Sequence, residues 1–131
     1  MAQEFSLDEA RAALAAARPP LARLQQVQRR LQEVRAALQA LGRRHLNDGV
    51  VGERDVHTLR AEQRRLGEQA QQLVTEIRTL GIELKSITEG LLDFPTHVEG
   101  APAYWCWRSG EADIGWWHPR STGFAGRRPI A

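Results

Sequence analysis

Apolar residues recur every three and four positions along two stretches of this chain, which is the spacing of helices in a coiled coil. The core positions of the first stretch are Leu24, Val27, Leu31, Val34, Leu38 and Leu41. Those of the second are Val56, Leu59, Gln63, Leu66, Ala70, Leu73, Ile77, Leu80, Leu84 and Ile87. The connection, residues 42–52, contains the turn sequence Asn47-Asp48-Gly49. The short connection predicts antiparallel packing, so residues 6–85 are predicted to form a coiled-coil-like helical hairpin.

A capping box places the start of the first helix. Ser6 suits the N-cap and Glu9 the third helical position, with Phe5 placed to pack on the first turn. Pro19-Pro20 removes two backbone donors inside the helical pattern, so we expect a kink or a short break there. The helix then resumes to about Leu41.

Charges beside the apolar seam favour one alignment of the two helices. Setting Leu38 opposite Leu59 also places Leu24 opposite Leu73. The same alignment gives the flanking pairs Arg44–Asp55, Arg23–Glu76 and Arg30–Gln69. Surface pairs of this kind contribute at most about 1 kcal/mol each, but they help to select a register.

Residues 86–131 differ sharply from the helices, because all four tryptophans and the only cysteine lie between Trp105 and Trp117. Residues 91–94 read as a strand ended by Pro95, and Gly100 and Pro102 mark a turn. Residues 103–108 and 113–118 read as two further strands. We expect a short three-stranded antiparallel sheet packed on the open end of the hairpin, in a single mostly α domain of residues 1–131.

Two registers fit the last two strands. A two-residue turn at Gly110-Glu111 gives the pairs Arg108–Asp113 and Trp105–Trp116. A loop one step longer gives the pairs Cys106–Trp116 and Tyr104–His118. We favour the shorter turn, because it uses the glycine and pairs opposite charges. A one-residue change exchanges the tryptophans that face inward, and in either register at least one is expected to stay partly exposed.

Composition and charge limit the function classes. The 131 residues carry a net charge of +2, and one cysteine excludes a disulfide framework. The chain has neither a signal-peptide pattern nor an apolar run long enough for a membrane helix, so we expect a cytoplasmic protein. Seven arginines between residues 18 and 44 face one acid, Glu33. This basic stretch is compatible with nucleic-acid binding, although a solvated helix face is its ordinary explanation.

Motifs along the whole chain resemble those of an uncharacterised bacterial family, catalogued as domain of unknown function 2203. They are Phe5-Ser6-Leu7-Asp8-Glu9-Ala10, Leu92-Asp93-Phe94-Pro95, Cys106-Trp107-Arg108, Gly110-Glu111, Trp117-His118 and Gly123-Phe124-Ala125-Gly126-Arg127-Arg128-Pro129. The resemblance implies the same fold outline and a prokaryotic origin. It implies no activity, substrate, cofactor or catalytic residue.

A mixed-ligand metal site in the tail would use Asp93, His97, Cys106 and His118. Their spacing matches no standard motif, and Cys106 could equally be a small buried apolar residue. Cys106 and His118 could also form a nucleophile and base, but a cysteine between two tryptophans is expected to be buried and inert.

Arg127 and Arg128 could hold a phosphate or a carboxylate, because the preceding glycines expose backbone N–H groups. The structural alternative pairs one arginine with Glu111, Asp113 or Asp93. We expect in particular a buried Asp93–Arg127 or Asp93–Arg108 pair.

The sequence therefore predicts a noncatalytic interaction module that binds a protein partner or a second copy of itself, and we expect a homodimer. The residues expected to contact the partner are Trp105, Trp107, Trp116, Trp117, Arg108, Arg127 and Arg128. No cofactor is expected, although the metal site or the arginine pair could hold a metal ion or a small anion. Nucleic-acid binding through Arg29 and Arg35 of the first helix is a further alternative.

Overall fold

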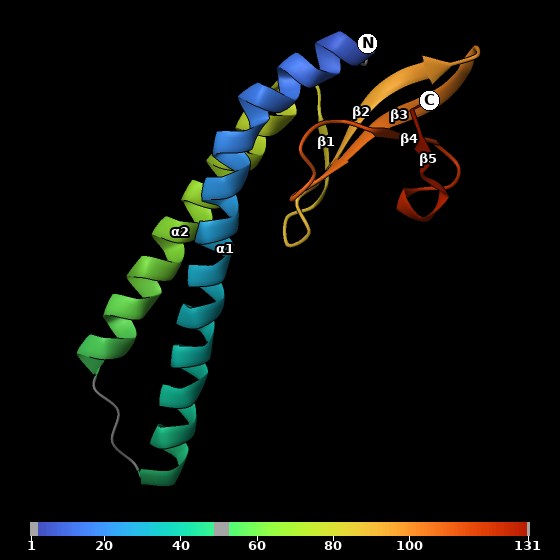
Figure 1. Ribbon diagram of the computed structural model, residues 1–131. Coiled ribbons are helices and arrows are strands. Elements are labelled where there is room, and N and C mark those ends of the chain that lie inside the picture. Colours follow the sequence, from blue (N-terminus) through green and yellow to red (C-terminus); the bar gives the residue numbers. More distant parts are fainter. Residues whose placement is uncertain (1–2, 49–52, 131) are drawn as a thin grey trace.

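The chain forms two long helices followed by five strands (Figure 1). The computed structural model describes residues 3–48 and 53–130, and the side chains of residues 44–48 and 53 are outside this description. The elements are α1 (Leu7–Asp48), α2 (Glu53–Thr79), β1 (Glu83–Ser86), β2 (Leu91–Val98), β3 (Ala101–Arg108), β4 (Trp116–Pro119), a 3-10 turn (Phe124–Gly126) and β5 (Arg128–Pro129). The two helices pack on each other, as predicted.

The capping box is present at the start of α1. The Glu9 backbone N–H donates to Ser6 Oγ at 3.1 Å, and the Ser6 N–H donates to Glu9 Oε1 at 2.8 Å. The Ser6 backbone N–H, followed by the Ser6 hydroxyl, holds the pKa of the Glu9 carboxyl below its usual value. Phe5 is buried and meets the Phe94 ring edge to face, with centroids 5.7 Å apart. The start of α1 is thereby attached to β2.

Helix α1 continues through Pro19 and Pro20, so the alternative of a short break is wrong. Figure 1 shows the N-terminal part of α1 inclined to the rest, which is the expected bend. The prolines leave the carbonyls of Ala15 and Ala16 without their usual helical donors. Both alanines are exposed, so water can hydrogen-bond these carbonyls and the helix continues.

The helix ends differ from the predicted ones. Helix α1 runs to Asp48, so residues 42–48 are helical, and residues 49–52 of the predicted loop lie outside the described residues. Helix α2 ends at Thr79. Leu84 and Ile87 therefore lie beyond the helix, although they continue its heptad pattern. Both pack against the core, which explains why apolar residues occupy these positions.

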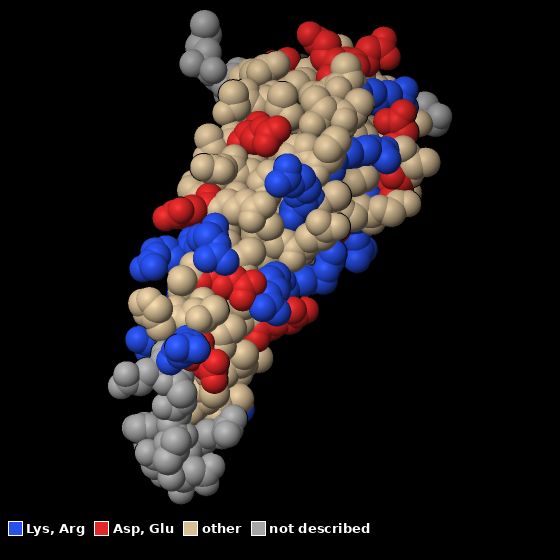
Figure 2. Space-filling view, turned by 90° about the vertical axis from the view of Figure 1, so that its left-hand side faces the viewer, with Lys and Arg blue, Asp and Glu red and all other residues tan. Residues whose placement is uncertain are grey.

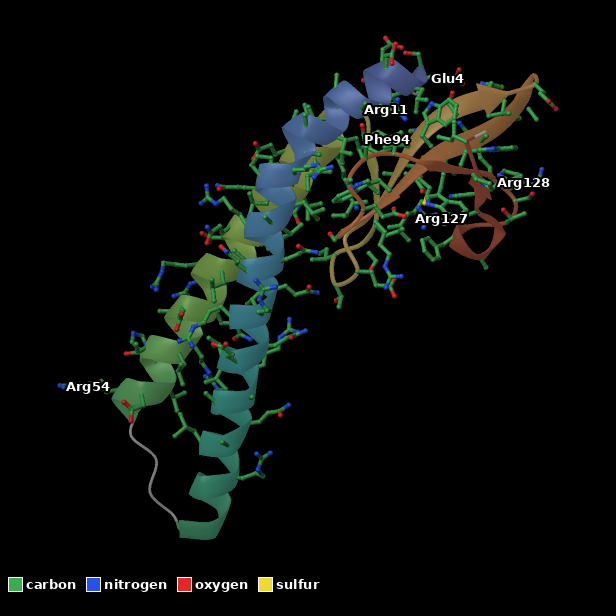
Figure 3. The ribbon with its side chains drawn as sticks, viewed as in Figure 1. Glu4, Arg11, Arg54, Phe94, Arg127 and Arg128 are labelled. Carbon is green, nitrogen blue, oxygen red and sulfur yellow. The ribbon has the colours of Figure 1, made fainter. Side chains whose placement is uncertain are left out.

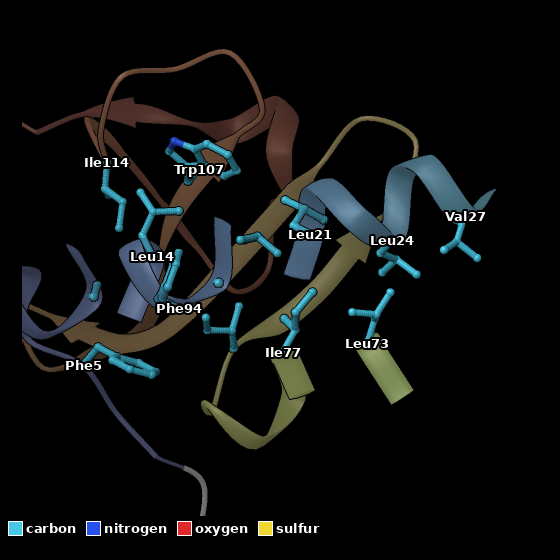
Figure 4. Packing of buried hydrophobic residues seen from close by; sticks show 14 residues of the cluster. Phe5, Leu14, Leu21, Leu24, Val27, Leu73, Ile77, Phe94, Trp107 and Ile114 are labelled. Carbon is cyan, nitrogen blue, oxygen red and sulfur yellow. The ribbon is translucent and has the colours of Figure 1, made fainter. Parts of the chain in front are cut away.

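The predicted alignment of the helices holds near the sheet, where Figure 4 shows Leu24 beside Leu73. The flanking charges pair differently. The Arg30 guanidinium binds both oxygens of Glu62, at 2.7 and 2.8 Å, and its described hydrogen bonds do not include one to Gln69. The guanidinium group binds a carboxylate such as that of Glu62 more strongly than an amide such as that of Gln69, because it can donate two parallel hydrogen bonds to the charged oxygens. The structure describes both Arg23 and Glu76 and shows no ion pair between them, while the Arg44 side chain is outside the description.

The sheet is antiparallel with the order β1-β2-β3-β4-β5. It therefore has five strands instead of the predicted three. Strand β2 passes through Pro95, which was predicted to end it. β1 pairs only with residues 91–93 of β2, so none of the described strands lies on that side of Pro95. The Pro95 carbonyl there accepts the Phe5 N–H at 2.8 Å. Glu99 and Gly100 then form a two-residue turn with positive φ at both positions, which suits a twisted hairpin.

The shared core lies between the helices and one face of the sheet (Figure 4). Leu92, Phe94 and Trp107 of the sheet pack with Leu14 and Ile77 of the two helices. The sheet covers only the end of the hairpin that carries the chain's N-terminus, and the other end projects away from it (Figure 1). The predicted packing of the tail on the open end of the hairpin is therefore confirmed.

The register of β3 and β4 is the alternative with the longer loop. Cys106 pairs with Trp116 and Tyr104 with His118, so the favoured two-residue turn is wrong. The connection begins with a turn in which the Glu111 N–H donates to the Arg108 carbonyl at 3.0 Å, and the residues after this turn are held by the helices. Ile114 is buried in the core, and Arg11 donates to its carbonyl at 3.0 Å.

Candidate functional site

Three chemically active side chains meet on the face of the sheet that points away from the helices. Side chains alternate along a strand, so the inward positions of Leu92 and Phe94 place Asp93 on the opposite face. Cys106 of β3 is the direct partner of Asp93. His118 of β4 arrives beside them because it pairs with Tyr104, two residues before Cys106.

Asp93, Cys106 and His118 form a compact, closed cluster. One ligand atom from each lies within 4.8 Å of the others. The residues are 3%, 0% and 1% exposed, respectively. His97, the fourth residue of the predicted metal set, does not join them. It lies near the exposed end of β2, with its Nδ1 2.7 Å from Glu4 Oε1.

The hydrogen bonds of His118 fix where its protons lie. Nδ1 lies 2.8 Å from the Pro119 carbonyl oxygen, which can only accept, so Nδ1 carries a hydrogen. Nε2 lies 3.1 Å from Asp93 Oδ2, so one proton is shared between these two atoms. The other oxygen, Oδ1 of Asp93, is buried and has no hydrogen-bond partner among the described residues.

Burial sets the protonation of the cluster. Desolvation raises the pKa of the Asp93 carboxyl, and His118 opposes this shift. Desolvation and the Asp93 carboxylate raise the pKa of the Cys106 thiol to about 12, with Arg127 acting in the opposite direction. Without a metal, Cys106 is therefore a neutral thiol near pH 7. These surroundings oppose the thiolate that the predicted nucleophile–base pair requires.

The C-terminal segment covers the region beside this cluster. The Arg127 guanidinium lies 4.9 Å from the ring centroid of Trp116 and 4.6 Å from that of Phe124. Its Nη2 atom donates to both carboxylate oxygens of Glu111, at 2.7 and 2.8 Å. The expected Asp93–Arg127 or Asp93–Arg108 pair is thus wrong. Asp93 pairs with His118, and Arg127 forms the Glu111 pair that was one of the structural alternatives.

The four tryptophans divide between the core and the surface. Trp107 is buried and Trp105 half-buried, and their indole N–H groups donate to the carbonyls of Glu111 and Phe5 at 3.0 and 2.9 Å. Trp117 is half-buried on the same face. Trp116 on the opposite face is 36% exposed, which confirms that one indole remains accessible.

Exposed arginines surround the accessible rings. Arg128 lies over Trp117 at 5.3 Å, and Arg108 lies over Phe124 at 5.6 Å. Within the part of the chain that the structure describes, neither arginine forms an ion pair. Figure 3 shows Arg128 extending from the edge of the sheet far from the hairpin. Trp117 and Arg128 pair across β4 and β5 and therefore share one face of the sheet, while Trp116 lies on the other face. We call Trp116, Trp117, Phe124, Arg108 and Arg128, which occupy both faces of this part of the sheet, the aromatic–arginine surface.

The basic stretch of α1 is partly neutralised. Arg30 pairs with Glu62 of α2 and also with Glu33, at 3.1 Å. Figure 2 shows acidic and basic side chains mixed along the visible face of the molecule. Arg29 and Arg35 are exposed, as a solvated helix face requires.

Two important residues had only weak signals in the sequence. Glu111 accepts from Arg127 and from the Arg108 backbone N–H, at 2.7 Å in each case. Its position after Gly110 indicates a turn, and the sequence offers it as a partner for an arginine only alongside Asp93 and Asp113. Ile114 falls in the predicted strand of residues 113–118, but β4 begins only at Trp116, so Ile114 lies in the preceding loop, and its burial in the core does not follow from a strand pattern.

The fold and its cluster define a small α+β protein, in which a helical hairpin packs on a five-stranded antiparallel sheet that carries a closed Asp–Cys–His group. The chain belongs to the family described as uncharacterized conserved protein (DUF2203), whose model matches residues 3–130. No curated protein and no solved structure matches the chain. Among the described residues, no helix combines the length and apolarity needed to cross a membrane.

Proposed function

We propose that this protein is a noncatalytic interaction module that binds an acidic, extended segment of a protein partner at its aromatic–arginine surface. The observation that carries the proposal is the exposed Trp116 ring, with Arg127 stacked on it and further arginines on the neighbouring rings. Tryptophan and arginine dominate the binding energy of protein interfaces. A ring already held by a cation loses little side-chain freedom when a partner binds.

Charge and strand order indicate the type of partner. Arg108 and Arg128 are exposed and form no ion pair with the described residues, so carboxylates of a partner can bind them. β5 is the last strand of the sheet, and no described strand covers its outer side. An extended segment can therefore add to this edge while its acidic side chains contact the arginines.

The closed Asp93–Cys106–His118 cluster favours a noncatalytic role. Its three residues are buried, so a substrate cannot contact them without a rearrangement of the covering segment. General acid–base or nucleophilic catalysis requires the catalytic side chain to lie within hydrogen-bond distance of the reacting group of the substrate.

Synthetic peptides provide a direct test. Fluorescence anisotropy would compare a labelled alternating Glu/Val peptide with a Gln/Val peptide and with a single-stranded oligonucleotide of equal length. We expect the Glu/Val peptide to bind most tightly. Trp116→Ala and Arg128→Ser should each weaken binding about tenfold, the size expected for a hot-spot residue.

Arg29→Ser on α1 is the matched control, because it removes an exposed arginine away from the sheet and should leave peptide binding unchanged. Peptide binding that is insensitive to Trp116→Ala and Arg128→Ser would overturn the proposal. Preferential oligonucleotide binding that Arg29→Ser weakens would support the nucleic-acid alternative instead.

Self-association is a second candidate, and the exposure of the hairpin favours it. Leu24 and Leu73 are buried beside the sheet, whereas Leu38 and Leu59 near the projecting end are only half-buried. A second hairpin could cover these side chains. Sedimentation equilibrium would show a dimer that Leu38→Glu converts to monomer, and a monomer at all concentrations would exclude this candidate.

A further inference from the structure

We propose that Asp93, Cys106 and His118 form a binding site for one thiophilic divalent metal ion, with zinc the best fit. This site is independent of the partner surface proposed above. It joins three strands, because its ligands come from β2, β3 and β4.

The distances suit a single ion. The three ligand atoms already lie within 4.8 Å of one another. Zinc binds sulfur at about 2.3 Å and nitrogen or oxygen at about 2.0–2.2 Å, so tetrahedral ligand atoms are separated by roughly 3.3–3.8 Å. Closing this gap requires a side-chain adjustment of about an ångström and no change of strand register.

The hydrogen bonds around the cluster match those of a metal ligand. The Nδ1–H of His118 donates to the Pro119 carbonyl at 2.8 Å, which fixes the ring and leaves Nε2 for an ion. Metal-bound histidines characteristically donate their other ring N–H to a carbonyl or a carboxylate. Asp93 Oδ1 is buried without a partner among the described residues, and a cation would remove the cost of this orphaned acceptor.

The charges of the site also balance. An ionised Asp93, an ionised Cys106 and a neutral His118 carry two negative charges, which a divalent ion cancels. Binding would release the Cys106 thiol proton and the proton shared by His118 and Asp93. A neutral buried site avoids the desolvation cost of an isolated charge.

The ligand types select the metal. Thiolate and imidazole favour zinc and similar transition metals, whereas magnesium and calcium prefer sites made of oxygen atoms. The three protein ligands leave a fourth position for water or a small ligand. Because the cluster is buried, the ion would be taken up during folding or through displacement of the C-terminal segment, and its role would be to fasten the strands.

Cobalt provides a test that reads the coordination directly. The full chain would be unfolded, stripped with a chelator and refolded with Co²⁺, and its absorption spectrum recorded. We expect a thiolate-to-cobalt charge-transfer band and about one ion per chain by elemental analysis. Cys106→Ser should abolish the band, and His118→Ala should remove the bound metal.

His97→Ala is the matched control, because it removes an exposed histidine outside the cluster and should retain both the band and the ion. Site variants that fail to fold do not weaken the test, since the refolded wild-type chain gives the answer alone. If it folds with Co²⁺ present yet shows neither the band nor bound metal, the proposal is overturned. The cluster would then be a hydrogen-bonded core pair beside a buried thiol.

Discussion

The Nε2 atom of His118 lies 3.1 Å from Oδ2 of Asp93, and this contact spans β3 to connect two strands that do not pair with each other. Both side chains are buried, so neither can exchange its partner for water. The pair therefore contributes to holding β4 and the segment after it on the sheet.

Removing one member of this pair should be costly. Asp93→Ala leaves the His118 ring buried without its acceptor, and we expect a loss of about 3 kcal/mol in the free energy of unfolding. Urea denaturation of the metal-free protein measures it. Glu89→Ala removes an exposed carboxylate and should change stability little. Equal free energies of unfolding for the two variants would mean that the buried pair does not stabilise the fold.

Gly90 should not tolerate a side chain. Its φ is +65°, and an added Cβ would lie 1.7 Å from Ser109 Oγ. Gly90→Ala should therefore lower the free energy of unfolding by about 1–3 kcal/mol. Gly115→Ala is the control, because a Cβ there meets no atom within 4 Å. Thermal denaturation should show a clear loss only for Gly90→Ala, and comparable losses would contradict the described turn.

Ile114 should act as the attachment of the β3–β4 loop to the helices. It is 1% exposed in the core, so Ile114→Ala should cost about 2–5 kcal/mol through lost burial and a cavity. Ile130→Ala removes the same atoms at a half-buried position and should cost less. Chemical denaturation of both variants compares them. A smaller loss for Ile114→Ala would place the loop outside the core.

The Arg30–Glu62 pair should give a small, pH-dependent stabilisation. Arg30 holds the pKa of the Glu62 carboxyl below its ordinary value, so the contribution is present above that value and is lost as the pH falls through the folded-state pKa. The stability difference between wild type and Glu62→Gln should therefore be larger at pH 7 than at pH 3. Glu76→Gln, at the predicted pair that does not form, should show no such difference in denaturation curves.

The Cys106 thiol should be unreactive toward thiol reagents in the folded, metal-free protein. Burial excludes reagents, and a thiol pKa of about 12 leaves almost no thiolate at pH 8. A colorimetric disulfide reagent should react only after denaturant is added. A second thiol at an exposed site, Ser121→Cys, should react at once and serve as the reference. Rapid labelling of wild type would show that the cluster is open.

The sequence predicted those features that depend on neighbouring residues or on a regular period. The Ser6–Glu9 capping box needs only one helical turn, and the pairing of Leu24 with Leu73 follows from heptads that have few alternative alignments. The division into a hairpin and an aromatic tail followed from where the tryptophans occur. The family motifs likewise indicate the family, because they are contiguous runs of residues that do not depend on the tertiary structure.

Tertiary structure decided the features in which distant segments compete for the same partner. The heptad pattern continues through Leu84 and Ile87, yet both residues lie after the end of α2. They still pack against the core, because an apolar side chain can be buried from a strand or a loop as well as from a helix. A long-range anchor, Ile114 in the core, prevailed over the tight turn that local charges favoured. In that register His118 forms a hydrogen bond with Asp93, and Arg127 forms an ion pair with Glu111. These contacts join residues 16 to 25 positions apart, so they arise only after the strands align.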